Sequence, residues 1–125
     1  MQPRLRLVVT LLGVFFALQG ALWLLAPARM AGSLGMPLLD GLGRSTQVGD
    51  FASFFLTAGV SMLIGSRPGQ ARLLYFPAAL IGGAAVTRTL AWLLQGADFA
   101  ALFIVVEIVT GVVLYRAAGK LDEPR

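Results

Sequence analysis

Arg88 and Glu107 are the residues best placed to do chemistry, because each is a single ionisable residue in the middle of a long apolar run. The short polar turn 95–98 joins the two runs, and both residues lie at nearly equal distances from it. If both runs are α-helices, a rise of about 1.5 Å per residue places both charges about 14 Å from the turn. That depth is close to the middle of a hydrocarbon layer of about 30 Å. Since an isolated charge there costs from about 3 to more than 10 kcal/mol, we predict that the two residues pair.

Other polar residues are predicted to reach the same depth. Asp50 and Arg88 lie almost equally far from the turn at 68–69, so straight helices would bring them level. Gln19 would join from the outer side of the first helix, and Trp92, one helical turn from Arg88, would cover the cluster. The predicted ligand-binding or buried polar cluster comprises Gln19, Arg44, Asp50, Arg88, Trp92 and Glu107.

This polar cluster has three interpretations that the sequence leaves open. In the first, Arg88 bridges Glu107 and Asp50, and the network is a structural plug that only fixes the pairing of helices. In the second, the charges line a pocket open to the outer leaflet, where they bind a polar head or move a proton. In the third, the cluster is part of a docking surface for a larger membrane complex.

The chain contains no Cys and no His, which excludes most catalytic and metal chemistry. Without them there is no common nucleophile–base pair and no usual ligand for haem, zinc or copper. Asp50 and Glu107 are available in principle as paired carboxylates, with Arg88 to hold an anion, but nothing in their spacing demands acid–base catalysis. We therefore predict no catalytic residue, no metal site and no cofactor, and we favour a non-enzymatic role.

The composition indicates a membrane protein. Of the 125 residues, 58% are hydrophobic and 13% are charged, against about 25% charged in soluble domains. The long apolar runs do not have the alternating pattern of an outer-membrane barrel. A net charge of +4 could suggest nucleic-acid binding, but the basic residues are scattered between apolar runs, so we predict no nucleic-acid partner.

The apolar runs predict an all-α fold, an integral membrane bundle of four transmembrane helices in a single domain (1–125). The expected spans are residues 5–26, 47–65, 72–95 and 99–116. A cleaved signal peptide is the alternative for the first span, but that run is longer than the usual h-region of about 7 to 15 residues. Trp23, near the end of this span, is expected in the aromatic belt of the membrane interface.

Residues 28–47 are predicted to form a long interfacial loop between the first and second helices, which lies in the interface or folds back over the bundle and has room for one short helix. Five glycine and proline positions between 32 and 43 argue against a continuous spanning helix, and the apolar residues among them argue against a free loop. In the second and third spans, small residues recur every four positions and are predicted to pack against each other. These two stripes are Ser53, Thr57, Ser61 and Gly65, and Ala79, Gly83 and Thr87.

The basic residues predict the orientation. One side of the membrane collects seven of them and the other collects two, Arg29 and Arg44. The larger set is Arg4, Arg6, Arg67, Arg72, Arg116, Lys120 and Arg125. Because basic residues favour the cytoplasmic side, we predict a multi-pass protein of the bacterial inner membrane with both termini in the cytoplasm.

Several short motifs resemble a family of small bacterial membrane proteins. They are the Trp-Leu-Leu-x-Pro of residues 23–27, Arg44-Ser45, Asp50-Phe51, and the intramembrane Arg88 and Glu107. Together they are similar to four-helix proteins of unknown function that are loosely DoxX-like. The resemblance implies a four-helix bundle with these polar residues inside and no established activity. Some DoxX-like proteins are associated with quinone-linked oxidation complexes, but this chain lacks the cysteines for thiol redox chemistry.

These observations lead to one functional hypothesis and two alternatives. We predict a non-enzymatic membrane protein that binds a membrane lipid or small amphipathic ligand at the polar cluster, or serves as an accessory subunit of other membrane proteins. The first alternative is a small transporter or proton-coupled carrier acting as a homo-oligomer. An enzyme acting on a lipid or quinone is the third hypothesis.

Overall fold

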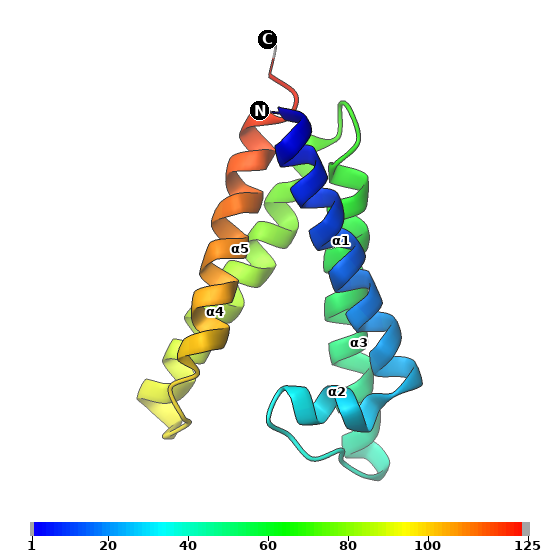
Figure 1. Cartoon of the computed structure of the whole chain (residues 1–125). Coiled ribbons are helices and arrows are strands. Elements are labelled where there is room, and N and C mark those ends of the chain that lie inside the picture. The colour runs from blue at the N-terminus through cyan, green and yellow to red at the C-terminus, as the bar shows by residue number, and fades with distance from the viewer. Residues whose placement is uncertain (1, 124–125) are drawn as a thin grey trace.

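The computed structural model describes residues 2–123, and its secondary structure is entirely helical (Figure 1). The elements are α1 (Gln2–Leu25), α2 (Pro27–Ser33), α3 (Gly41–Gly65), the 3₁₀ turn η1 (Ala71–Leu74), α4 (Tyr75–Gln95) and α5 (Ala101–Lys120). Four helices, with η1 and α4 counted as one, are long and apolar enough to cross a membrane. The predicted all-α class, with four helices long and apolar enough to span a membrane, is confirmed within these residues. Arg125, one of the basic residues used for orientation, lies outside them.

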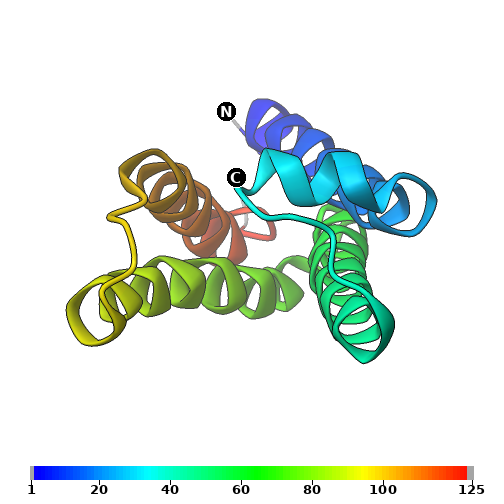
Figure 2. The ribbon, with the colours of Figure 1, turned by 90° about the horizontal axis from the view of Figure 1, so that it is seen from below.

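The four long helices form two pairs that diverge. α1 packs mainly against α3, and α4 packs mainly against α5. Figure 1 shows that these two pairs, which we call the α1/α3 arm and the α4/α5 arm, meet at the end that carries both termini and separate at the other. We call these the narrow end and the wide end. Seen from the wide end in Figure 2, the two arms lie on opposite sides of a central space.

Glycines let the helices of the α1/α3 arm approach closely. A Cβ added at Gly59 would lie 2.3 Å from the backbone nitrogen of Ala17 on α1. The predicted contact between the stripes of the second and third spans is wrong at Gly83, because a Cβ there would meet nothing within 4 Å. Close backbone approach through small residues is typical of membrane helices, but here it joins α3 to α1 rather than to α4.

The predicted long loop at 28–47 is not formed, although the short helix for which the segment had room is. Residues 27–33 form α2, which extends from the end of α1 toward the middle of the wide end (Figures 1 and 2), and α3 begins at Gly41. Gln47 fixes the intervening residues: its Oε1 accepts a hydrogen bond from the Leu39 amide at 2.9 Å, and its Nε2 donates to the Pro37 carbonyl at 3.0 Å. The buried Gln47 side chain therefore supplies hydrogen bonds that the backbone of a free loop would take from water.

Arg44 explains why α3 begins before the predicted start at 47. Its Nε donates to the Leu39 carbonyl at 2.8 Å, and its Nη2 lies 3.2 Å from the Asp40 carboxylate. These contacts stabilise the first turn of α3. Gly43 costs only about 1 kcal/mol as a helix residue. Its missing side chain leaves room for Leu39, whose Cβ would be 3.2 Å from an added Cβ. Glycine content therefore did not stop the helix.

At the narrow end, a shared hydrophobic core joins the two arms. Its members come from all four long helices and η1, and the largest fully buried ones include Val9, Met62, Leu74 and Leu114. A smaller core near α2 contains Trp23, which is fully buried and stacked on Phe51 with ring centroids 4.8 Å apart. The expectation of an interfacial Trp23 is therefore wrong, because protein covers the ring on every side.

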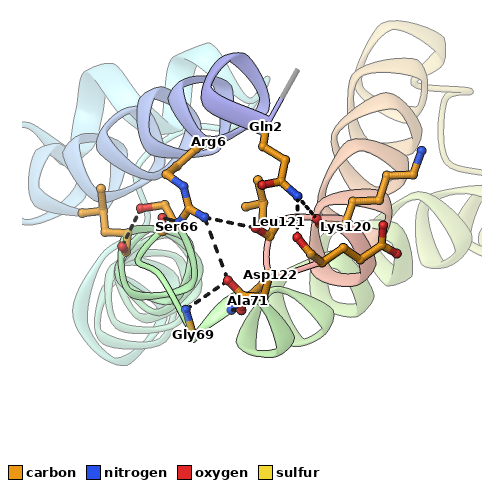
Figure 3. Close-up of polar contacts among 10 residues, drawn as sticks. Gln2, Arg6, Ser66, Gly69, Ala71, Lys120, Leu121 and Asp122 are labelled. Atoms are coloured by element: carbon orange, nitrogen blue, oxygen red, sulfur yellow. Dashed lines mark hydrogen bonds and ion pairs between the residues drawn. The ribbon is translucent and has the colours of Figure 1, made fainter. Parts of the chain in front are cut away.

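Polar contacts reinforce the narrow end, and Figure 3 shows them in close-up. Arg6 on α1 donates to the Ser66 carbonyl after α3 and to the Leu121 carbonyl after α5. Gln2 donates to the Lys120 carbonyl at 2.8 Å. Because one side chain of α1 reaches both arms, these contacts tie the arms together where they meet.

Asp122 completes these contacts from the C-terminal segment. Its carboxylate accepts the backbone N–H groups of Ala71 at 2.9 Å and Gly69 at 3.0 Å, and it lies 3.9 Å from Arg6 (Figure 3). The Ala71 and then the Gly69 hydrogen bond, with the charge of Arg6, lower the pKa of the Asp122 carboxyl below its ordinary value of 3.8, while partial burial opposes the shift. Asp122 therefore stays ionised and holds the α3–α4 turn at neutral pH.

Candidate functional site

A cavity of about 640 Å³ lies between the two arms. Its walls come from α1 and α3 on one side and from α4 and α5 on the other, and Ser33 and Leu34 border it beside α2. It forms because the helix pairs diverge from the narrow end, as Figure 1 shows, while the core there fixes the angle between them. The lining is mostly apolar, with a few polar side chains.

Arg88 and Glu107 meet on the α4/α5 arm and line this cavity. Arg88 Nε lies 3.0 Å from Glu107 Oε1 and donates a hydrogen bond to Oε2 at 3.2 Å. The side chains are 32% and 16% exposed, so the pair is only partly buried. The Arg88 guanidinium carbon also lies 4.7 Å from the centroid of the Phe103 ring. The predicted pairing is confirmed, because helical rise and a short turn bring equidistant residues level.

Asp50 and Gln19 line the same cavity from the opposite arm. The structure thus brings together Gln19, Asp50, Arg88 and Glu107. Within residues 2–123, however, Asp50 forms no ion pair and no side-chain hydrogen bond. The bridge from Arg88 to Asp50, on which the plug interpretation depended, is not formed, because the arms diverge between them.

Arg44 and Trp92 lie outside the cavity lining. Arg44 pairs with Asp40 at the start of α3, and both side chains are exposed. Trp92 packs edge-on against Phe99, with ring centroids 5.0 Å apart. The structure therefore places these two predicted members of the cluster away from the other four.

Sequence reasoning did not single out the aromatic rings of the cavity. Six phenylalanines line it: Phe15, Phe16, Phe51, Phe54, Phe55 and Phe103. They escaped notice because phenylalanine is ordinary in an apolar run. A usable signal was the spacing of Phe51, Phe54 and Phe55, which places three rings on one side of a helix next to Asp50.

A second hollow of about 610 Å³ lies against the start of α3. It is lined by Met36, Leu39, Leu42, Gly43, Thr46, Gln47, Asp50 and Phe51. Asp50 and Phe51 line both spaces, so these two residues stand between the cavity and the hollow. The Asp50 carboxylate is therefore placed where it can face either one.

The described residues hold no group of three or more His, Cys, Asp or Glu side chains that could bind a metal ion. The ionisable groups of the cavity are one arginine and two carboxylates. Such a set can bind polar or charged groups and can exchange a proton.

Four helices long and apolar enough to span a membrane indicate a multi-pass membrane protein, and the open cavity between its arms carries polar side chains. The chain matches no family model, no curated protein and no solved structure. The resemblance to DoxX-like proteins stays a prediction.

Proposed function

We propose that this protein binds a lipid-like or small amphipathic ligand, without catalysis, in the cavity between its two arms. The observation that carries the proposal is one space that combines apolar, phenyl-rich walls with Gln19, Asp50, Arg88 and Glu107. Its volume falls within the range of about 300–1,000 Å³ typical of small-molecule sites. An amphipathic molecule suits such a space, because its apolar body covers the walls and its head contacts the polar groups.

The proposed orientation places the narrow end, with both termini, on the cytoplasmic side of the bacterial inner membrane. Support comes from the basic residues, since Arg6, Arg67, Arg72 and Lys120 gather at the narrow end while Arg29 and Arg44 lie at the wide end. The cavity then opens toward the outer leaflet, from which an amphipathic molecule can enter between the arms.

Native mass spectrometry of protein extracted from its own membrane in a mild detergent tests the proposal. We expect an extra retained mass that is lost in Ala84→Trp, since Ala84 lines the cavity and an indole there would obstruct it. Val105→Trp is the control, because Val105 is an exposed residue of α5 that does not line the cavity. Equal retention in Ala84→Trp, or a bare chain in every sample, would contradict the proposal. A larger defined assembly would instead favour an accessory subunit.

A small proton-coupled carrier is the second candidate. It is favoured by the position of Asp50, whose side chain lines both the cavity and the second hollow. A carboxylate at such a position can take up a proton on one side and release it on the other. The candidate predicts flux of an amphipathic substrate into liposomes that depends on a proton gradient and is lost in Asp50→Asn. The absence of flux at any pH removes this candidate.

A further inference from the structure

We propose that the ligand of the cavity carries a positive charge: an organic cation with an apolar, aromatic-compatible body. This inference rests on the proposed function and names the chemical class of its ligand. It follows from three features of the cavity: the balance of its charges, the state of its arginine and the chemistry of its walls.

The charged residues of the cavity do not balance. Asp50 and Glu107 are the carboxylates, and Arg88 is the one cationic residue in the lining. Arg88 is paired with Glu107 at 3.0 Å, whereas Asp50 has no charged partner within the described residues. Asp50 is exposed and lines this open cavity, so its unpaired carboxylate is within reach of a ligand, and a cation beside it would balance its charge.

The arginine is poorly placed to receive an anion. Its guanidinium is engaged by Glu107 and lies over the Phe103 ring. An anionic head would have to compete with the Glu107 carboxylate for Arg88, and it would also be repelled by both carboxylates. The arrangement therefore disfavours an anionic head.

The walls of the cavity suit a cation. Phe51, Phe54 and Phe55 lie on α3 close in sequence to Asp50, and Phe15 and Phe16 face the same cavity from α1. The negative face of a phenyl ring attracts a cation within about 6 Å, and the attraction grows when water is excluded. A bulky organic cation gains from these rings and from Asp50, and it loses less hydration than a metal ion on entering.

A pair of ions with nearly the same shape and opposite charge tests the inference. Tetraphenylphosphonium and tetraphenylborate are titrated separately into the protein in phosphatidylcholine nanodiscs, and binding to empty nanodiscs is subtracted. We expect the protein to bind the cation and not the anion above this background. Ala84→Trp should abolish binding of the cation, which locates it in the cavity.

Variants of the carboxylate give the decisive comparison. Asp50→Asn should weaken binding of tetraphenylphosphonium by about tenfold, the effect of removing one partly screened charge from contact distance. Asp50→Glu keeps the charge and should retain the preference for the cation. Asp98→Asn, the same chemical change in the exposed α4–α5 connection, should bind as the wild type does.

The outcomes separate this inference from the proposed function. Stronger binding of tetraphenylborate, or an unchanged affinity for the cation in Asp50→Asn, overturns the cationic ligand. If the cation does not bind but the wild type retains an extra mass that Ala84→Trp loses, the proposed function stands and the ligand's charge is wrong. If neither the cation nor an extra mass is retained, both proposals fail.

Discussion

Exchanging the charges of Arg88 and Glu107 measures how much their ion pair contributes to the fold. Arg88→Glu and Glu107→Arg each place two like charges at a site where opposite charges now meet 3.0 Å apart. The double variant restores opposite charges with the positions reversed. A pair that acts directly should therefore lose stability in each single variant and recover it in the double.

The distance sets the magnitude. At 3.0 Å and an effective dielectric constant of about 20, the gross attraction is about 5 to 6 kcal/mol. Desolvation offsets part of this, and breaking a buried pair usually costs about 3–5 kcal/mol. Because the Arg88 side chain is 32% exposed, we expect each single variant to lose about 3 kcal/mol of unfolding free energy, the lower end of this range. The double variant should lie within about 1 kcal/mol of the wild type.

The assay is the free energy of unfolding in mixed micelles, measured by far-UV circular dichroism as denaturing detergent is added. Asp40→Asn is the control, because it removes the ion pair between Asp40 and Arg44, and both of these side chains are exposed. Its loss should stay below about 1 kcal/mol. If the double variant is no more stable than the two single variants, Arg88 and Glu107 do not pair directly. That result would also refute the argument that equal depth in the helices makes them pair.

Four further substitutions, in three tests, probe other parts of the fold by the same unfolding measurement. Gly59→Ala should destabilise the protein by about 1–3 kcal/mol, because the added Cβ would lie 2.3 Å from the Ala17 backbone nitrogen. Gly83→Ala is the control and should be neutral or stabilising, because a Cβ there meets nothing within 4 Å. Equal effects of the two substitutions would contradict this packing. Asp122→Asn should lower stability at neutral pH but not in acid. The lowered pKa of the Asp122 carboxyl stabilises the fold above pH 3.8, and this stabilisation disappears as the pH falls through the shifted pKa. A loss that does not depend on pH would argue against a stabilising role of the ionised carboxylate. Gln47→Leu should cost about 1–3 kcal/mol and speed proteolysis at residues 34–40, since it removes two part-buried hydrogen bonds, to the Leu39 amide and the Pro37 carbonyl. Unchanged cleavage would show that other contacts hold the segment.

The position of Asp50 shows how far depth arithmetic reaches. Counting residues from the turn placed Asp50 level with Arg88, and both do line one cavity. Counting says nothing about the angle between helices, so it predicted a bridge that the diverging arms do not form. Arg44 shows the same limit, because its partners, the Leu39 carbonyl and Asp40, lie in a segment whose fold depends on buried Gln47.

The sequence by itself determined the four spanning helices and the pairing of Arg88 with Glu107. Hydrophobicity and helical rise are properties of the local chain. Because a short turn joins α4 to α5, residues equally far from the turn lie at the same depth on the two helices. Only the tertiary structure decided which helices pair, because Gly59 contacts the Ala17 backbone through a close approach that small residues elsewhere in the chain allow equally well. It also decided the divergence of the arms, since the core that fixes the angle between them brings together residues of all four long helices that are distant in sequence. The cavity exists because of that divergence, and so it could not be read from the residues that line it.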